Sequence, residues 1–290
     1  MKLVWKFNLV LLAIFVIGVG VAALVSHRVL QANAREEIVQ NARLMMEAAL
    51  SSRTYTSKQI KPLLETQLKY TFLPQTVPAF AATEVFNDLR KKHPDYGYKE
   101  ATLNPTNPRD RASDWEADVV QAFRQNPATA ELVGERDTPT GPALYLARPI
   151  QITDPACLAC HNTAETAPKT MLDVYGGANG FGWKMNEIIG AQLVSVPMSV
   201  PIQRANHVFR TFMLSLAGIF LVAFVLLNAM LHFMVIRPVT KLASVADQVS
   251  LGNFEAGEFK SHSNDEIGVL TDALGRMKTS LVQAMKMLDT

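Results

Sequence analysis

Reactive side chains and net charge are both scarce in this chain of 290 residues. It has two cysteines and three tryptophans, and 28 basic against 26 acidic residues leave a formal net charge of +2. A near-neutral chain without a basic run has no electrostatic footprint for nucleic acid, so no nucleic-acid partner is expected. A zinc site would need further ligands, and there is no second cysteine pair to supply them.

Charge is entirely missing from two apolar runs, residues 7–25 and 211–236. At 1.5 Å per residue a helix over the first run reaches roughly 28 Å, about the thickness of a bilayer core. An uncleaved anchor is favoured over a cleaved signal peptide, because the run exceeds the usual 7–15 apolar residues. The second run contains Asn228 and His232. Polar groups at membrane depth are functional candidates, although a helix–helix hydrogen bond or a place near the headgroups explains them more simply.

These runs divide the chain into five predicted segments. They are a cytoplasmic N-terminus (1–6), a transmembrane helix (7–26), a central domain (27–208), a second transmembrane helix (209–236) and a cytoplasmic C-terminal domain (237–290).

Both cysteines lie in the stretch "DPACLACHNT", where Cys157 and Cys160 are followed directly by His161. This spacing is typical of covalent haem attachment: two thiols add to the porphyrin vinyl groups and the adjacent imidazole ligates the iron. A plain disulfide with a coincidental histidine is the main alternative, and a thioredoxin-like pair would require a βαβ pattern that is not found. We therefore expect one covalently attached haem c, with His161 as the proximal ligand.

Haem attachment also predicts the location of the chain. Covalent attachment in bacteria takes place outside the cytoplasmic membrane, so the central domain is expected in the periplasm. Lys2 and Lys6, before the first run, agree with a cytoplasmic N-terminus. The sequence thus predicts a multi-pass protein of the bacterial inner membrane.

The central domain predicts an α+β fold. Residues 27–64 form a long helical stretch with a heptad-like stripe, which is either a dimer seam or a face packed on the domain itself. The stripe comprises Ile38, Ala42, Met45, Ala49 and Ser52. Helices are expected at 79–94 and, capped by Ser113, at 114–125. Strands are expected at 95–104, 131–138, 142–152 and 186–199, arranged as an antiparallel meander in a PAS-like fold.

Three stretches carry a resemblance to a known family: "NARLMMEAALSSRTYTSKQIKPLL", the strand "YLARPI" leading into "CLACH", and "GFGWKMNEIIGAQLVSVPMSV". Over about 35–199 the chain resembles a bacterial family of single-haem c-type domains with a PAS-like fold. In a relative of that family a cysteine thiolate is the second iron ligand. This chain departs from that pattern, because haem attachment uses both of its cysteines.

The sixth iron ligand therefore has to come from elsewhere. Met45 or Met46 are the first candidates, since thioether ligation raises the potential of a haem, although methionines at helical spacing are commonly core residues. Met171, Met185 and His93 are weaker candidates, and an open position would bind a small gas. Further pocket candidates are aromatic residues that equally suit a simple core, and an arginine that suits either a haem propionate or a structural role. They are Tyr145, Tyr175, Phe181, Trp183 and Arg148.

The C-terminal segment repeats apolar residues at steps of three and four. The positions are Val235, Val239, Leu242, Ala246 and Val249, and then Ile267, Leu270, Leu274, Met277, Leu281, Ala284 and Leu288. Two short heptad helices bury their seams against a partner chain, which predicts a parallel four-helix bundle from two subunits. An unrelated coiled-coil tail is the alternative.

The segment 237–288 is also similar to HAMP signal-relay domains. Four signature residues carry the similarity: Pro238 after the membrane run, Phe254 in the connector "GNFEAGEF", and Asp265 and Glu266 opening "DEIGVL". The similarity implies a homodimer, through the HAMP and membrane helices, that passes helix motions to a kinase, cyclase or chemoreceptor-type output protein. Because the chain stops at Thr290, that output protein is expected to be separate.

The favoured function is a membrane-anchored haem sensor that detects redox state or a small ligand, such as a gas, and relays it through the HAMP domain. A membrane-anchored electron-transfer cytochrome is the alternative, but it leaves the relay-like segment idle. No convincing distal acid–base constellation favours a haem enzyme, so an enzyme is not expected.

Overall fold

The computed structural model describes residues 3–255, 257, 259 and 264–288. Contacts divide the chain into two compact units, one formed by 26–209 and the other by 1–25 together with 210–290. Each unit is described by itself.

A long helix, α1 (Leu3–Tyr55), runs into the central unit and ends earlier than predicted. It is followed by a π-helical turn, η1 (Thr56–Ile60), a 3-10 turn, η2 (Lys61–Leu64), and the short α2 (Glu65–Leu68). Pro62 explains the change, because proline has no N–H to donate and its ring clashes with the carbonyl four residues earlier. The chain accommodates Pro62 by a wider turn before it and a tighter one around it.

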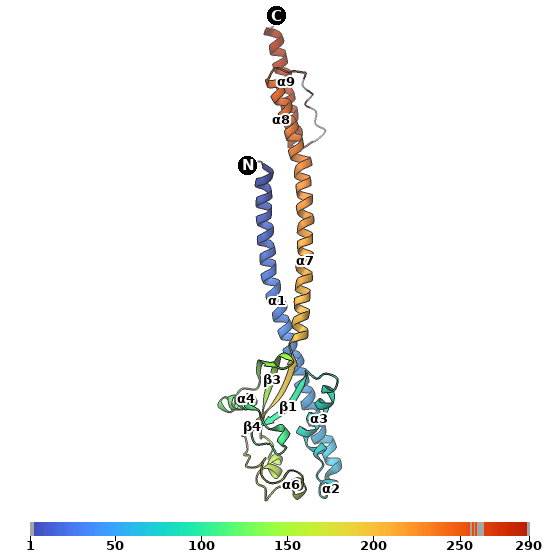
Figure 1. The fold of residues 1–290 in the computed structure, drawn as a ribbon, viewed down its shortest axis with the longest axis vertical. Helices are drawn as coiled ribbons and strands as arrows, with labels where there is room; N and C mark the ends of the chain where they lie inside the picture. The colour runs from blue at the N-terminus through green and yellow to red at the C-terminus, as the bar shows by residue number, and fades with distance from the viewer. Residues whose placement is uncertain (1–2, 256, 258, 260–263, 289–290) are drawn as a thin grey trace. The chain divides into compact units, whose positions relative to one another are not determined.

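The sheet has four antiparallel strands: β1 (Gly97–Thr102), β2 (Leu132–Thr138), β3 (Gly141–Gln151) and β4 (Ile188–Pro197). Their order is β1-β4-β3-β2 (Figure 1). The expected meander holds for β2, β3 and β4, but it is wrong for β1, which pairs with β4 rather than β2. The helix α4 (Asp114–Gln125) separates β1 from β2 in sequence and packs on β1, β3 and β4, which carries the chain across the sheet. The mixed α+β prediction is confirmed, and the PAS-like assignment stays a prediction.

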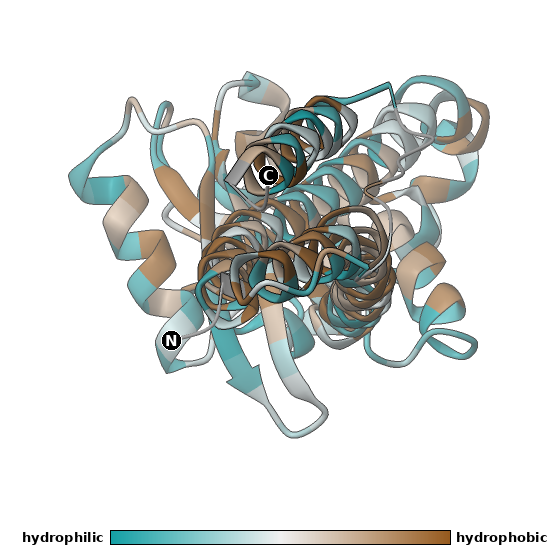
Figure 2. Cartoon of the chain, turned by 90° about the horizontal axis from the view of Figure 1, so that it is seen from above, coloured by the Kyte–Doolittle hydropathy of each residue, from teal (hydrophilic) through white to brown (hydrophobic). Residues whose placement is uncertain are grey.

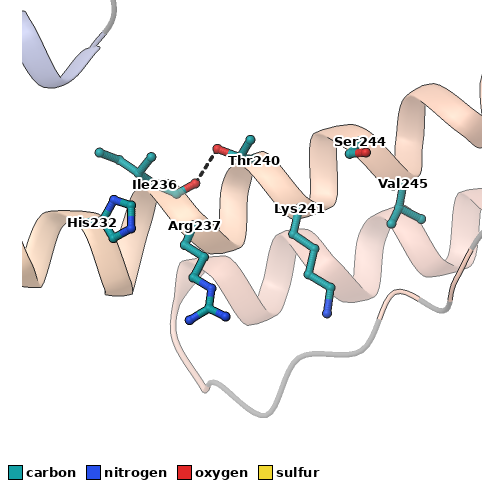
Figure 3. Close-up of a pocket in the computed structure, with 7 residues that line it drawn as sticks. All are labelled: His232, Ile236, Arg237, Thr240, Lys241, Ser244 and Val245. Carbon is teal, nitrogen blue, oxygen red and sulfur yellow. Dashed lines mark hydrogen bonds between the residues drawn. The ribbon is translucent and has the colours of Figure 1, made fainter.

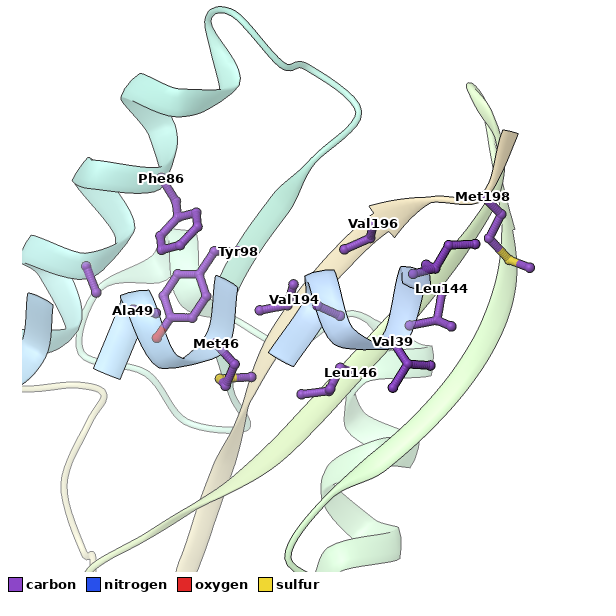
Figure 4. Close-up of a cluster of buried hydrophobic side chains, with 13 residues drawn as sticks. Val39, Met46, Ala49, Phe86, Tyr98, Leu144, Leu146, Val194, Val196 and Met198 are labelled. Carbon is purple, nitrogen blue, oxygen red and sulfur yellow. The ribbon is translucent and has the colours of Figure 1, made fainter. Parts of the chain in front are cut away.

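One face of the sheet packs against α1 and α3 (Pro78–Arg90). Figure 4 shows Met46 of α1 near Leu146 and Val194 of the sheet, and Ala49 beside Tyr98. Ile38, Ala42, Met46 and Ala49 are all fully buried here. The stripe on the long helix is therefore a face packed on its own domain, and the dimer-seam interpretation is wrong for Ile38, Ala42 and Ala49.

The other face of the sheet is covered by α4. Phe123 and Val120 of this helix are fully buried against a cluster that includes the small residues Ala101 and Ala147, which allow close approach. The predicted start of α4 after Ser113 is confirmed, since the Glu116 carboxylate accepts the Ser113 backbone N–H at 2.7 Å.

The second unit is helical among its described residues. It contains most of α7 (Ser199–Met230), a π-turn η6 (Leu231–Ile236), α8 (Arg237–Ser250) and α9 (Glu266–Leu288). Two helices of the chain are long and apolar enough to cross a membrane, and the helices seen end-on near the centre of Figure 2 are mostly brown, the colour of hydrophobic residues. Phe15 and Phe220 stack with ring centroids 4.8 Å apart.

The predicted HAMP residues occupy helix boundaries. Pro238 lies in the first turn of α8, directly after the π-turn η6, so a wider turn precedes this proline as it precedes Pro62. Asp265 caps α9, because its Oδ1 accepts the backbone N–H groups of Ile267 and Gly268 at 3.0 and 3.1 Å. Glu266 opens α9, where its charge suits the helix dipole. Phe254 is half-buried in the connector, part of which lies outside the described residues.

Candidate functional site

The cysteine motif occupies one short helical stretch directly after β3. A 3-10 turn, η5 (Pro155–Cys157), continues into α5 (Leu158–His161). Asp154 caps the turn by accepting the Ala156 N–H at 2.8 Å. Cys157 and Cys160 are both free thiols of intermediate exposure. Two thiols and an imidazole are thus presented by a single rigid segment.

The imidazole of His161 is held in one tautomer. Its Nδ1 lies 2.8 Å from the Gly180 carbonyl oxygen, and because a carbonyl only accepts, Nδ1 must carry the proton. Burial lowers the pKa of His161, an effect that the Gly180 hydrogen bond partly opposes, so the ring is neutral at pH 7. Its Nε2 therefore keeps a lone pair, which is the state of a metal-ligating histidine.

Two loops support this histidine, one containing Gly180 and Trp183 and the other containing Asn104 and Thr106. Trp183 stacks on the imidazole with ring centroids 3.9 Å apart, and its backbone N–H donates to the His161 carbonyl at 3.2 Å. Gly180 has a φ of +83°, and a Cβ there would lie 2.8 Å from the Thr106 Cα and overlap the Thr106 hydroxyl. The Gly180 N–H donates to Asn104 Oδ1 at 3.3 Å. Only glycine fits at this contact, and that is why its carbonyl reaches His161.

The predictions missed Asn104 and Thr106. Thr106 Oγ1 lies 3.4 Å from His161 Nδ1, across 55 positions of sequence. Gly180 opens the stretch "GFGWKMNEIIGAQLVSVPMSV" quoted above, but no local pattern marks which residues that stretch would contact.

The predicted aromatic residues are only partly brought together. Trp183 lies on His161, and the Phe181 backbone carbonyl accepts from Asn104 Nδ2 at 3.4 Å. Tyr175, at the end of α6 (Lys169–Tyr175), contacts the ring of Phe72 edge-on. Tyr145 packs instead on Trp115, with centroids 5.4 Å apart, at the cluster beneath α4.

Arg148 is engaged in ion pairs rather than left free for a propionate. Its Nη1 donates to Glu47 at 2.6 Å and its Nε to Glu131 at 3.2 Å. Of the two roles expected for Arg148, the structural one accounts for these contacts.

The methionine candidates are spread over the domain. Met46 is fully buried in the apolar core and Met45 packs at its edge. Met171 is buried in α6, Met185 is exposed, and His93 contacts Tyr96. Burial raises the pKa of Cys157 and of Cys160. The charges that oppose this rise come from further along the chain than Met45 and Met46: Arg53, in the last turn of α1, acts on Cys157, and Lys61, in η2, acts on Cys160. Ligation by Met45 or Met46 stays a prediction.

In the described part of the chain, no three His, Cys, Asp or Glu side chains gather where they could hold a metal ion. A hollow of about 460 Å³ lies along η6 and α8 in the second unit. Figure 3 shows the side chains of Arg237 and Lys241 extending to the same side of α8 there, near His232. It carries no chemistry related to the cysteine motif.

Comparison with known proteins gives two family matches. The model of a family described as Tll0287-like matches residues 31–197. The HAMP domain family matches residues 230–283. Among solved structures, the chain is similar to the "cyanobacterial heme-protein Tll0287", with 15% identity, a TM-score of 0.44, and coverage of 56% of this chain and 95% of that one. No curated protein matches the chain.

Proposed function

This chain belongs to the Tll0287-like family, and we propose that it is a membrane-anchored receptor whose central domain carries one covalently attached haem c. In this proposal Cys157 and Cys160 form the two thioethers and His161 ligates the iron. The chemistry that the haem supplies is a change of iron charge or ligation, and it constitutes the signal. The HAMP match at 230–283 supports a relay of that signal.

One observation carries the assignment: the geometry around His161. Its Nδ1–H is held by the Gly180 carbonyl at 2.8 Å and its ring is fixed by Trp183, so the free Nε2 has a defined direction. A disulfide would make no use of that arrangement. Second hydrogen bonds of this kind orient metal-ligating histidines and raise their basicity.

The rest of the proposal concerns topology. The chain is taken to cross the inner membrane twice, at 7–26 and 209–236, with the domain between the spans in the periplasm. It acts as a homodimer through the HAMP and membrane helices, and it passes redox state or ligand binding to a separate kinase, cyclase or chemoreceptor-type protein. No catalytic role is assigned.

Mass analysis of the peptide containing the motif tests the haem directly. The full chain is expressed in cells that mature cytochromes c, and the peptide should carry one haem. Cys157→Ser or Cys160→Ser should leave a single thioether, and the double variant none. His161→Ala should keep the attached mass but change the visible spectrum, in which added carbon monoxide reports an open position. Unmodified or disulfide-linked cysteines would contradict the proposal.

The relay is tested against the electron-transfer alternative by deleting 237–290. The haem spectrum should persist while the cellular response is lost. Intact electron transfer after the deletion, with no signalling partner detected, would favour the anchored cytochrome.

A further inference from the structure

Helix α1 is fixed to the sheet by ion pairs of two kinds. Arg35 and Glu135 form an exposed pair, with side chains 55% and 44% accessible. Arg53 and Glu100 form an enclosed pair, with side chains 26% and 5% accessible. An exposed pair contributes little, whereas the enclosed pair is a costly arrangement that apolar residues could replace without loss of stability. Stability therefore does not explain why charges lie there.

Both carboxylate oxygens of Glu100 in the enclosed pair accept hydrogen bonds. Arg53 Nη1 donates to Glu100 Oε2, and the Tyr98 hydroxyl donates to Glu100 Oε1 at 2.7 Å. Gln192 Nε2 donates in turn to the Tyr98 oxygen at 3.4 Å. Burial raises the pKa of Tyr98, so its hydroxyl stays a donor. The Glu100 carboxylate thereby joins β1 to α1, and Tyr98 extends the network to β4.

Glu100 links the segment that contacts His161 to the end of α1. Glu100 is in β1, and the chain leaving β1 carries Asn104 and Thr106, which contact Gly180 and His161. Arg53 lies in the last turn of α1, just before the π-turn η1. Single π-helical turns are frequent at functional sites. The segment 100–106 therefore contacts the histidine loop through Asn104 and Thr106, and it contacts α1 through Glu100.

We propose that strand β1 couples the His161 loop to α1, with Arg53 and Glu100 as the joint. A shift of His161 moves Asn104 and Thr106. The strand transmits this movement to Glu100 and so changes the ion pair between Glu100 and Arg53. Arg53 and Glu100 are positioning residues, since neither touches the imidazole. The inference rests on the proposed function for its stimulus, but the contacts themselves do not involve the haem.

Hydrogen exchange on the full chain in lipid nanodiscs tests this coupling. His161→Ala serves as a perturbation that does not require haem, and reduction of the oxidised protein serves as a second where mass analysis finds the haem attached. We expect His161→Ala to change exchange at residues 48–60 by roughly threefold or more, because local opening responds to lost contacts.

The decisive variant replaces both partners, Arg53→Met with Glu100→Gln, so that no charge is left unpaired and the glutamine still accepts from Tyr98. Its matched control makes the same two changes in the exposed pair, Arg35→Met with Glu135→Gln. The response at 48–60 should vanish in the first and persist in the second. The coupling is overturned if the exchange response at 48–60 persists in the Arg53/Glu100 double variant or is lost in both double variants. It is also overturned if His161→Ala alone produces no response.

Tyr98→Phe keeps the ion pair and removes one hydrogen bond, and it replaces the double variant if that does not fold. It should weaken the response, and an unchanged response would count against the proposal. Because the histidine arm needs no haem, a negative mass result refutes the proposed function without deciding the coupling.

Discussion

Gly180 offers the sharpest test of how the histidine is held, because Gly182 provides a control two residues away. Both have positive φ, +83° and +78°, but a Cβ on Gly182 meets nothing within 4 Å, whereas one on Gly180 meets Thr106. The left-handed conformation costs an alanine about 1–2 kcal/mol at either position. Gly180→Ala adds overpacking against the Thr106 backbone, worth about 1–3 kcal/mol. We therefore expect a loss of about 2–5 kcal/mol for Gly180→Ala and about 1–2 kcal/mol for Gly182→Ala.

The assay is urea unfolding of the full chain in detergent, followed by tryptophan fluorescence, together with the visible spectrum. Gly180→Ala should also alter the spectrum, because displacing the Gly180 carbonyl releases the His161 Nδ1–H that it holds at 2.8 Å. Gly182→Ala should leave the spectrum unchanged. Equal losses of stability in the two variants, or equal spectra, would refute the steric reasoning.

Three further predictions use the same unfolding assay. Burial raises the pKa of Asp110 to about 6, from an ordinary value of 3.8. The folded state thus holds the proton more tightly, so stability should fall as the pH rises from about 4 to 6, and Asp110→Asn should remove that slope. Glu116→Ala should lower stability by about 2–4 kcal/mol, since the buried carboxylate both caps α4 and forms an ion pair with Lys99 at 2.6 Å. Glu116→Gln should recover the share of that loss that comes from the lost cap. Met46→Leu should cost less than about 1.5 kcal/mol because volume is kept, and an unchanged ferrous spectrum would exclude Met46 as iron ligand.

Local patterns predicted the local structure well. The strands expected at 142–152 and 186–199 correspond to β3 and β4, and the cap expected at Ser113 marks the start of α4, because strand formation and helix capping depend on neighbouring residues. The cysteine motif is likewise local, so its short helical segment follows from a few adjacent residues.

Contacts distant in sequence could not be predicted in the same way. The pairing of β1 with β4 places Tyr98 opposite Val194, and no residue pattern in either strand predicts which strand it pairs with. The support of His161 by Thr106 depends on a loop 55 positions away. Such contacts are set by how the chain crosses the sheet, which apolar alternation does not record.

Heptad spacing predicts an apolar stripe on a helix, but it does not predict which surface covers that stripe. On α1 the spacing is met by the domain's own sheet, because Leu146 and Val194 cover Met46 and its neighbours. On α9 the same spacing leaves Leu270, Met277 and Leu281 more than 40% exposed within one chain. A helix stripe is stable only when something covers it, and α9 lacks a sheet to do so among the described residues of its unit. The homodimer therefore stays a prediction for the HAMP helices, where a second copy would bury these three side chains.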